Sequence, residues 1–287
     1  MPIHPQAAVS PYAILGENVK IGPFCVVEPG VVIGDNSTLS SRVAVKSGTT
    51  LGRGNHICEG AVLGGLPQHV HMPESPGRLT IGDGNVIREN VTIHRAMDAN
   101  KSTRIGSFCL IMVGAHVAHD CSLGDNVIMT NNALLGGHVH VEDRAYISGA
   151  VAVHQFCRIG SLAMVGGLAR VRQDVPPFVT VDGGTTMVVG LNRVGLRRAG
   201  LTAEHIDQIK SAYKLIYRSG LPWDEMLEVL EQEFTEGPAA EFAVFFRNGQ
   251  RGFVQERRTP PGATVRLVRD EDDAQPLSHH GAEKMAG

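Results

Sequence analysis

An aliphatic residue recurs at every sixth position of this chain from Ile3 to Val171. Of the 29 positions in that frame, 26 are Leu, Ile, Val or Met, and the exceptions are His69, Ser75 and Ala99. The position four residues after each aliphatic is mostly small, and Gly often follows the aliphatic directly. A sustained period of six is typical of a parallel β-helix built from hexapeptide repeats.

Each hexapeptide supplies one short strand and one corner of such a β-helix. The aliphatic side chain points inward, the small residue fits the crowded corner, and glycine relieves backbone strain at the turn. Three hexapeptides form a triangular coil of 18 residues, and coils stack about 4.8 Å apart, so the repeat predicts roughly nine coils. The 34 glycines and the aromatic content of only 5% agree with a core of stacked small aliphatic side chains.

The frame also indicates how the chain is divided. We expect a β-helix over 1–177, interrupted by loops at 65–79 and 95–104, where the frame of six breaks. Long excursions from a regular solenoid are usually functional. The period then changes, and residues 190–250 are expected to form a helical domain. Its helices are predicted near 203–218, 221–234 and 238–249, the first with Thr202 as N-cap and Gly220 as its stop. The charged segment 255–287 is predicted to be a disordered tail.

Composition narrows the possible functions. The net charge of −3 gives no reason to expect a nucleic-acid partner. No apolar run is long enough for a membrane span, and the first residues do not resemble a signal peptide. The number of cysteines is odd, and four of the five fall in the small inward register, which favours packing in a reducing cytoplasm over disulfides. Those four are Cys25, Cys109, Cys121 and Cys157.

The segment AHVAHDC (115–121) is the strongest candidate for catalytic chemistry. A neutral imidazole such as that of His119 can take a proton from a hydroxyl, and Asp120 can orient the ring and stabilise the imidazolium. Gly137 follows His119 by 18 residues, so it should lie one coil further along at the same corner. Two other interpretations remain at this point: a metal site that includes His116 and His119, and a solenoid scaffold without catalysis.

Seven segments in the same order resemble the UDP-N-acetylglucosamine O-acyltransferase family. The resemblance covers about residues 1–250 and rests on VTIHR (91–95), AHVAHDC (115–121), NNALLGGHV (131–139), AVHQFCRIG (152–160), MVGG (164–167), QDVPPF (173–178) and YKLIYRSG (213–220). It implies a left-handed β-helix, a cytoplasmic homotrimer and the first step of lipid A synthesis. It implies transfer of a (3-hydroxy)acyl chain from acyl carrier protein to the 3-position of UDP-N-acetylglucosamine, with no cofactor and no metal.

The resemblance also assigns residues. His119 matches the family's general base, and Gly137 matches the glycine whose N–H stabilises the oxyanion. Gly167 matches the position that sets acyl-chain length. The matching substrate-binding positions are His116, His138, His154, Gln155, Asn192 and Arg198. A basic surface for acidic acyl carrier protein could be formed by Arg170, Arg172, Arg193, Arg197 and Arg198.

The sequence departs from the family where the acceptor should bind. His69 and His71 stand where the family usually has an acid and a lysine, Val194 replaces a Glu, and Ala199 replaces an Arg. These changes leave a second function open, in which the same base acylates oxygen or nitrogen of a different nucleotide amino sugar. A further alternative is a metal enzyme of the γ-carbonic anhydrase type, with the ion bound at a trimer interface.

Overall fold

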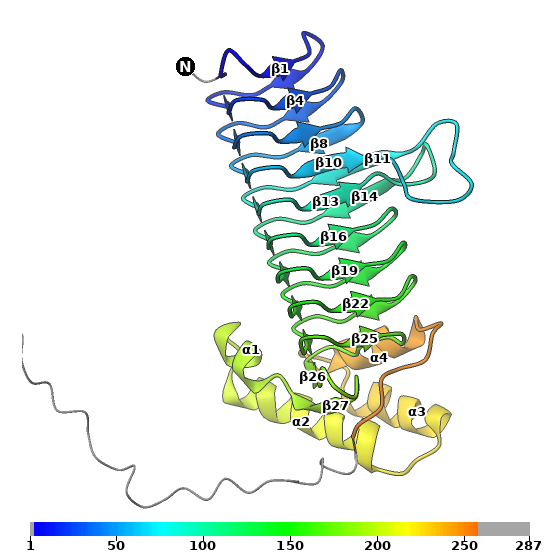
Figure 1. Cartoon of the computed structure of the whole chain (residues 1–287). Helices are drawn as coiled ribbons and strands as arrows, with labels where there is room; N and C mark the ends of the chain where they lie inside the picture. Colours follow the sequence, from blue (N-terminus) through cyan, green and yellow to red (C-terminus); the bar gives the residue numbers. More distant parts are fainter. Residues whose placement is uncertain (1–2, 258–287) are drawn as a thin grey trace, which may run out of the picture. The chain divides into compact units, whose positions relative to one another are not determined.

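A computed structural model of the chain describes residues 3–257, so the predicted tail lies outside the described residues apart from its first three positions. Residues 3–256 belong to one compact unit, which begins with a triangular prism of stacked coils (Figure 1). The chain winds left-handed from one coil to the next (Figure 1). The predicted parallel β-helix with a C-terminal helical region is therefore confirmed.

The three faces of the prism are three sheets. The first has nine strands, which matches the predicted number of coils: β1 (Ala8–Val9), β4 (Val26–Val27), β7 (Ala44–Val45), β10 (Val62–Gly65), β13 (Thr92–His94), β16 (His116–Val117), β19 (Leu134–Leu135), β22 (Ala152–Val153) and β25 (Arg170–Val171). The second has eight: β2 (Ile14–Leu15), β5 (Val32–Ile33), β8 (Thr49–Leu51), β11 (Arg78–Ile81), β14 (Ser102–Ile105), β17 (Ser122–Leu123), β20 (His140–Val141) and β23 (Arg158–Ile159).

The third sheet has ten strands: β3 (Lys20–Ile21), β6 (Thr38–Leu39), β9 (His56–Ile57), β12 (Val86–Ile87), β15 (Leu110–Ile111), β18 (Ile128–Met129), β21 (Tyr146–Ile147), β24 (Met164–Val165), β26 (Val179–Val181) and β27 (Val188–Leu191). Every pair in the three sheets is parallel except β26 with β27. Paired residues such as Leu135 and Val153 are 18 apart, as the repeat predicts.

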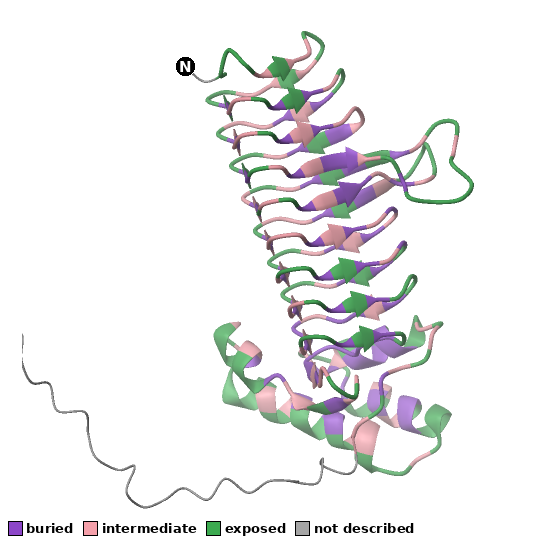
Figure 2. Ribbon diagram, in the orientation of Figure 1, coloured by how far each residue is buried: buried purple, intermediate pink, exposed green. Residues whose placement is uncertain are grey.

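The inward aliphatic of each strand forms the core. Along the prism these side chains are buried in one continuous cluster, whereas their outward neighbours are mostly half-buried or exposed (Figure 2). The four cysteines of the small register are buried and free, as predicted, and Cys58 is buried too. Burial raises the pKa of the Cys109 thiol to about 11, so this thiol stays protonated and inert.

Two loops leave the prism where the frame breaks. They connect β10 to β11 and β13 to β14, and they project on the same side of the prism (Figure 1). They add 12 residues and 6 residues to their coils, because β8 pairs with β11 at a spacing of 30 and β13 pairs with β16 at a spacing of 24. The stacking of the core continues unbroken across both insertions.

In the described part of the chain, four helices follow the prism: α1 (Arg193–Arg198), α2 (Ala203–Arg218), α3 (Trp223–Glu233) and α4 (Ala240–Arg247). The predicted helix at 203–218 is confirmed, and the Thr202 side chain accepts a hydrogen bond from the His205 N–H as its N-cap. The helices share a second core that includes Phe178 and Leu162 from the end of the prism. None of the helices described here is both long and apolar enough to span a membrane.

Candidate active site

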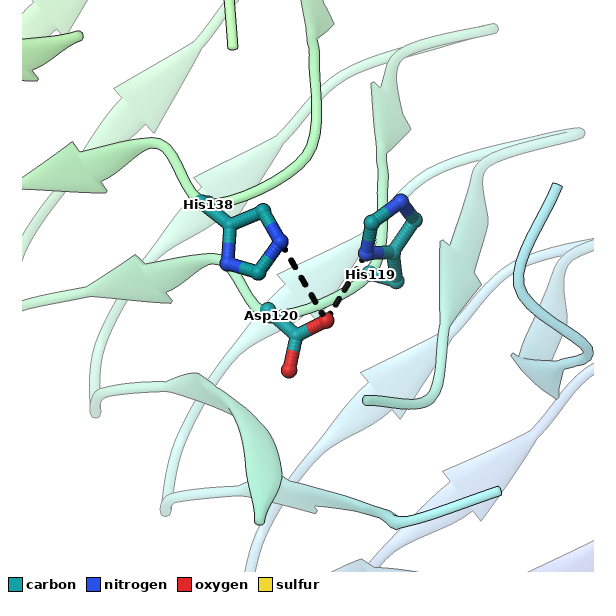
Figure 3. Close-up of side chains that lie close together, drawn as sticks. All are labelled: His119, Asp120 and His138. Atoms are coloured by element: carbon teal, nitrogen blue, oxygen red, sulfur yellow. Dashed lines mark hydrogen bonds and ion pairs between the residues drawn. The ribbon is translucent and has the colours of Figure 1, made fainter. Parts of the chain in front are cut away.

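The AHVAHDC segment forms a corner of the prism between β16 and β17. There the Nδ1 of His119 lies 2.8 Å from Oδ2 of Asp120, and both side chains are nearly buried (Figure 3). The Met97 backbone N–H donates to the same Oδ2 at 3.1 Å, so the second loop helps to hold the carboxylate. The backbone N–H of Asp120 is itself held by the Thr103 hydroxyl at 2.8 Å.

This contact determines which tautomer a neutral His119 ring adopts. An ionised carboxylate can only accept hydrogen bonds, so Nδ1 of a neutral His119 must carry the proton. The lone pair is then on Nε2, which points away from Asp120. A neutral imidazole with its Nε2 free and its Nδ1–H on a carboxylate is the arrangement of a general base with its orienting acid.

Gly137 lies directly against this ring, one coil further along the prism. A Cβ atom built on Gly137 would come within 2.7 Å of His119 Cε1 and 2.8 Å of Nε2, so no other residue fits without moving the imidazole. The next residue, His138, donates its N–H to the His119 carbonyl at 3.0 Å. Within the described range 3–257, the Gly137 N–H has no acceptor, so it is available to a ligand beside Nε2.

His138 is the second imidazole at this corner. Asp120 and His138 both occupy the positive-φ position of their turns, with φ of 59° and 60°, and the 18-residue spacing stacks them. Nε2 of His138 is 3.8 Å from Asp120 Oδ2 (Figure 3), and its ring lies flat on Phe156 at 4.6 Å. The pKa of His138 is lowered, chiefly because the ring is partly buried, although the nearby Asp120 acts to raise it. The lowered pKa favours a neutral ring.

The first loop brings a third imidazole to the base. The His69 ring meets the His119 ring edge to face, with centroids 5.9 Å apart. The His71 N–H and carbonyl lie 3.1 Å and 3.2 Å from His69 Nδ1, so either neutral tautomer of His69 can be satisfied. Both loop histidines are exposed in the isolated chain, and the His71 side chain lies further from the base.

Buried His94 and half-buried His116 form a second pair of imidazoles in contact with each other. His116 contacts the Thr92 hydroxyl at 2.7 Å through Nδ1, and its ring packs against His94 at 4.8 Å. Burial lowers the pKa of His116. The pKa of His94 falls to about 4, mainly because the ring is buried and also because His116 and His119 are close to it. The Nδ1 of His94 is buried with no hydrogen-bond partner in the part of the chain that the structure describes.

Two clusters could hold a cation, judged on residues 3–257. One is His119, Asp120 and His138, whose ligand atoms lie within 4.8 Å of one another. The other is Cys58, Glu59 and Glu89, at a corner beside β9. His116 belongs to neither, so the alternative of a metal site that includes both His116 and His119 is not assembled among these residues.

Comparison with known proteins identifies the family. A profile described as "Udp N-acetylglucosamine O-acyltransferase; Domain 2" matches residues 174–254, and a bacterial transferase hexapeptide profile matches 12–46 and 102–137. The acyl-[acyl-carrier-protein]–UDP-N-acetylglucosamine O-acyltransferase of Halorhodospira halophila is 49% identical over 88% of this chain and 99% of its own length. The chain belongs to this family. The Herminiimonas arsenicoxydans protein of the same name is 48% identical over 92% of this chain and 99% of its own.

Solved structures of the O-acyltransferase family have the same fold. The UDP-N-acetylglucosamine O-acyltransferase of Moraxella catarrhalis matches with a TM-score of 0.85 and 37% identity, over 89% of this chain and 100% of that one. The Bacteroides fragilis enzyme matches with a TM-score of 0.84 and 39% identity, over 88% and 99%.

The other residues matched to the family are further from His119, but not all of them lie at another corner. His154 and Gln155 are at the same corner, two coils further along, where the Phe156 N–H donates to the Gly137 carbonyl at 3.1 Å. His154 and Gln155 are exposed at the corner after β22, with His154 Nδ1 3.1 Å from the Gln155 carbonyl. Gly167 is exposed at the corner after β24, where an added Cβ would meet only the Gly149 carbonyl at 3.4 Å and the Ser148 Cβ at 3.9 Å. A side chain therefore fits at Gly167 in the single chain.

Asn192 and Arg198 lie at the C-terminal end of the prism, in and beside α1, well away from β16 (Figure 1). Both ends of the Asn192 amide are used within the chain: Oδ1 accepts from the Gly195 N–H and Nδ2 donates to the Leu162 carbonyl. Asn192 thus caps α1 and joins it to the prism, a structural role that sequence reasoning missed. Arg198 is exposed, together with Val194.

His94, whose ring packs against His116, was not singled out from the sequence. An added Cβ at Gly65 would lie 2.9 Å from the His94 ring, so a glycine of the preceding coil makes room for it. The pairing of the strands accounts for the position of His94. Because β13 pairs with β16 at a spacing of 24, His94 aligns with Ala118 of the next coil, which precedes His119. Reading that spacing from the sequence required knowing that the second loop adds six residues to its coil.

Proposed function

We propose that this family member transfers an acyl chain from acyl carrier protein to UDP-N-acetylglucosamine, with His119 as general base. Its relatives carry that donor and acceptor in their names at 48–49% identity. The observation that carries the assignment of the base is the His119–Asp120 contact of 2.8 Å, with Nε2 turned toward Gly137. This reaction is the first step of lipid A synthesis.

The chemistry follows from the three groups at that corner. Nε2 of His119 removes the proton of the sugar 3-hydroxyl as its oxygen attacks the thioester carbonyl. The N–H of Gly137 donates to the oxyanion of the tetrahedral intermediate, where one such donor is typically worth about 10²–10³ in rate. When the carbon–sulfur bond breaks, the imidazolium returns its proton to the leaving thiolate, and Asp120 stabilises the imidazolium between the two transfers.

Substrate binding is assigned to the surrounding side chains. His69 and His138 pack against the His119 ring, and we assign contacts with the sugar and the thioester to them and to His71 and His116. His154, Gln155 and Arg198 would contact the donor and the nucleotide, with the Arg198 guanidinium suited to a phosphate. Gly167 leaves room for a long acyl chain. We include Asn192 as a nucleotide-binding residue through the α1 terminus that it caps.

We further propose a cytoplasmic homotrimer. Flat prism faces that expose Val26 and Leu134 support association of chains, because these aliphatic side chains are 42% and 46% exposed on the nine-stranded sheet. The exposed residues assigned to binding but distant from His119 could then complete a pocket on a neighbouring chain. Five free cysteines support a reducing compartment. The arginines near the C-terminal end would receive acidic acyl carrier protein.

The test is a reconstituted reaction. Purified protein is incubated with acyl carrier proteins of several chain lengths and several UDP-amino sugars, and products are identified by mass spectrometry. His119→Ala should retain the fold and lower kcat at least ~10²-fold, since general-base catalysis contributes about 10²–10⁴. His140→Ala is the matched control, because His140 lies on a different sheet, in β20. Near-normal turnover by His119→Ala would refute the assignment of the base.

A further inference from the structure

The corner that carries the base also has the donor set of a transition-metal site. Asp120 Oδ2 lies 2.8 Å from His119 Nδ1 and 3.8 Å from His138 Nε2 (Figure 3). The ligand atoms of a tetrahedral zinc site are separated by roughly 3.3 Å, given Zn–N and Zn–O bonds of about 2.0–2.1 Å. Small rotations of the two rings would therefore bring two imidazole nitrogens and one carboxylate oxygen to metal-binding distances.

The surroundings hold these ligands in place. The His138 ring is stacked on Phe156 with an angle of only 7° between planes, and it meets His119 edge to face at 5.2 Å. The Met97 N–H supports the Asp120 carboxylate. His138 remains 38% exposed on its side chain, so an ion can approach from its side. Preorganised ligands with supporting contacts and a route of entry are what metal binding requires.

We propose that a divalent transition-metal ion of the Zn²⁺ class binds to His119, Asp120 and His138 and reversibly inhibits the enzyme. The inhibition rests on the proposed function, while binding of the ion does not. Two imidazoles and a carboxylate select Zn²⁺, Co²⁺ or Ni²⁺ over Mg²⁺ and Ca²⁺, which prefer oxygen ligands.

The inhibition follows from the tautomer of the base. The ion would replace the proton on His119 Nδ1, which now lies on Asp120. A neutral imidazole that binds a metal through Nδ1 carries its proton on Nε2. Nε2 then becomes a donor and can no longer accept the proton of the sugar hydroxyl. Occupancy of the site would thus remove the base without disturbing the fold.

The second cluster is the natural competitor, and its contacts argue against it. Both oxygens of Glu89 are engaged by the Arg88 guanidinium, at 2.9 Å and 3.0 Å. A cation already occupies the position where a metal ion would bind, and the ion would have to displace it. Cys58→Ser therefore provides a matched control, because it removes the only sulfur ligand of that cluster and leaves His119, Asp120 and His138 intact.

The experiment uses the full-length protein freed of metal by a chelator. Co²⁺ is titrated while its visible absorption is recorded, and Zn²⁺ is then added to displace it. We expect a Co²⁺ band in the wild type and in Cys58→Ser, with at least ~10-fold weaker binding in His138→Gln. Zn²⁺ should raise the Tm of the wild type but not of His138→Gln, since only a ligand bound to the native state stabilises it.

Activity assays separate the two proposals. Metal-free enzyme should transfer acyl chains, Zn²⁺ should abolish the transfer, and chelator should restore it, while Mg²⁺ has no effect. The inference is overturned if no Co²⁺ band forms, or if the band is lost in Cys58→Ser and kept in His138→Gln. It is also overturned if chelated enzyme is inactive until Zn²⁺ is added. Metal binding by a protein that does not acylate UDP-N-acetylglucosamine would refute the proposed function alone.

Discussion

Replacing Gly137 with alanine tests the catalytic corner through a single methyl group. The backbone N–H is kept, so the proposed oxyanion donor survives. The new Cβ would lie 2.7 Å from His119 Cε1, whereas ordinary contact begins near 3.4 Å. The imidazole must therefore move by ~0.7 Å, and it cannot do so freely because its Nδ1 is held by Asp120 at 2.8 Å.

The magnitude follows from that displacement. Misplacement of a reacting group by about 1 Å can cost ~10²-fold in rate. We expect kcat of Gly137→Ala to fall by ~10–10² with acyl carrier protein donor and saturating UDP-N-acetylglucosamine. Thermal stability should change little, because the φ of Gly137 lies outside the left-handed region and alanine is compatible with it.

Gly149→Ala is the matched control for this experiment. Gly149 occupies the same position of its turn, before a residue with positive φ, but an added Cβ there meets nothing closer than 3.6 Å. Its kcat should stay within about twofold of the wild type. Equal activity of the two variants would show that the contact between Gly137 and His119 does not position the base, and the reasoning would fail.

Three further predictions concern other parts of the site. Gly167→Met should shift donor preference toward shorter acyl chains, measured as kcat/KM across a series of acyl carrier proteins; unchanged selectivity would remove Gly167 as the ruler. His69→Asp/His71→Lys should lower the KM for UDP-N-acetylglucosamine, because these changes restore the acid and the lysine that the family usually has in this loop, and a lysine ammonium binds phosphate well; an unchanged KM would refute the role of the loop. His94, whose pKa falls to about 4 mainly through burial, binds its proton more weakly when folded than when unfolded. Its contribution to stability is thus present above pH ~6.5 and lost as pH falls toward 4, by roughly 3 kcal/mol. Urea unfolding should show that the free energy of unfolding of His94→Gln falls less steeply than that of the wild type as the pH is lowered from 6.5 to 4. An identical dependence on pH would contradict the argument.

The repeat made part of the site predictable. The position of Gly137 against His119 follows from 18-residue coils, because nothing interrupts the frame between them. The same arithmetic fails across the two loops, whose lengths are free. The approach of His69 to His119 and the support of Asp120 by Met97 were therefore inaccessible from the sequence.

The helical region shows a second limit of sequence reasoning. A long helix with a capping threonine was predictable, since α2 has its own start signal at Thr202. The six-residue α1 was not predicted, because it depends on Asn192 bonding to both Gly195 and the end of the prism at Leu162. Short helices held by tertiary contacts leave little trace in local sequence.

The two ends of the prism differ, and the difference determines where the molecule can loosen. At the N-terminal end β1 and β2 are edge strands with exposed or half-buried side chains, whereas the last coils are covered by β26, β27 and the helices. In a stack where each coil contacts only its neighbours, fraying starts at the free end and each step must break one more layer. His119 follows β16, the sixth strand of nine in its sheet. Thermal fraying that begins at the N-terminal end therefore stops before it reaches His119. The enzyme can tolerate local unfolding of its first coils while the catalytic corner stays ordered.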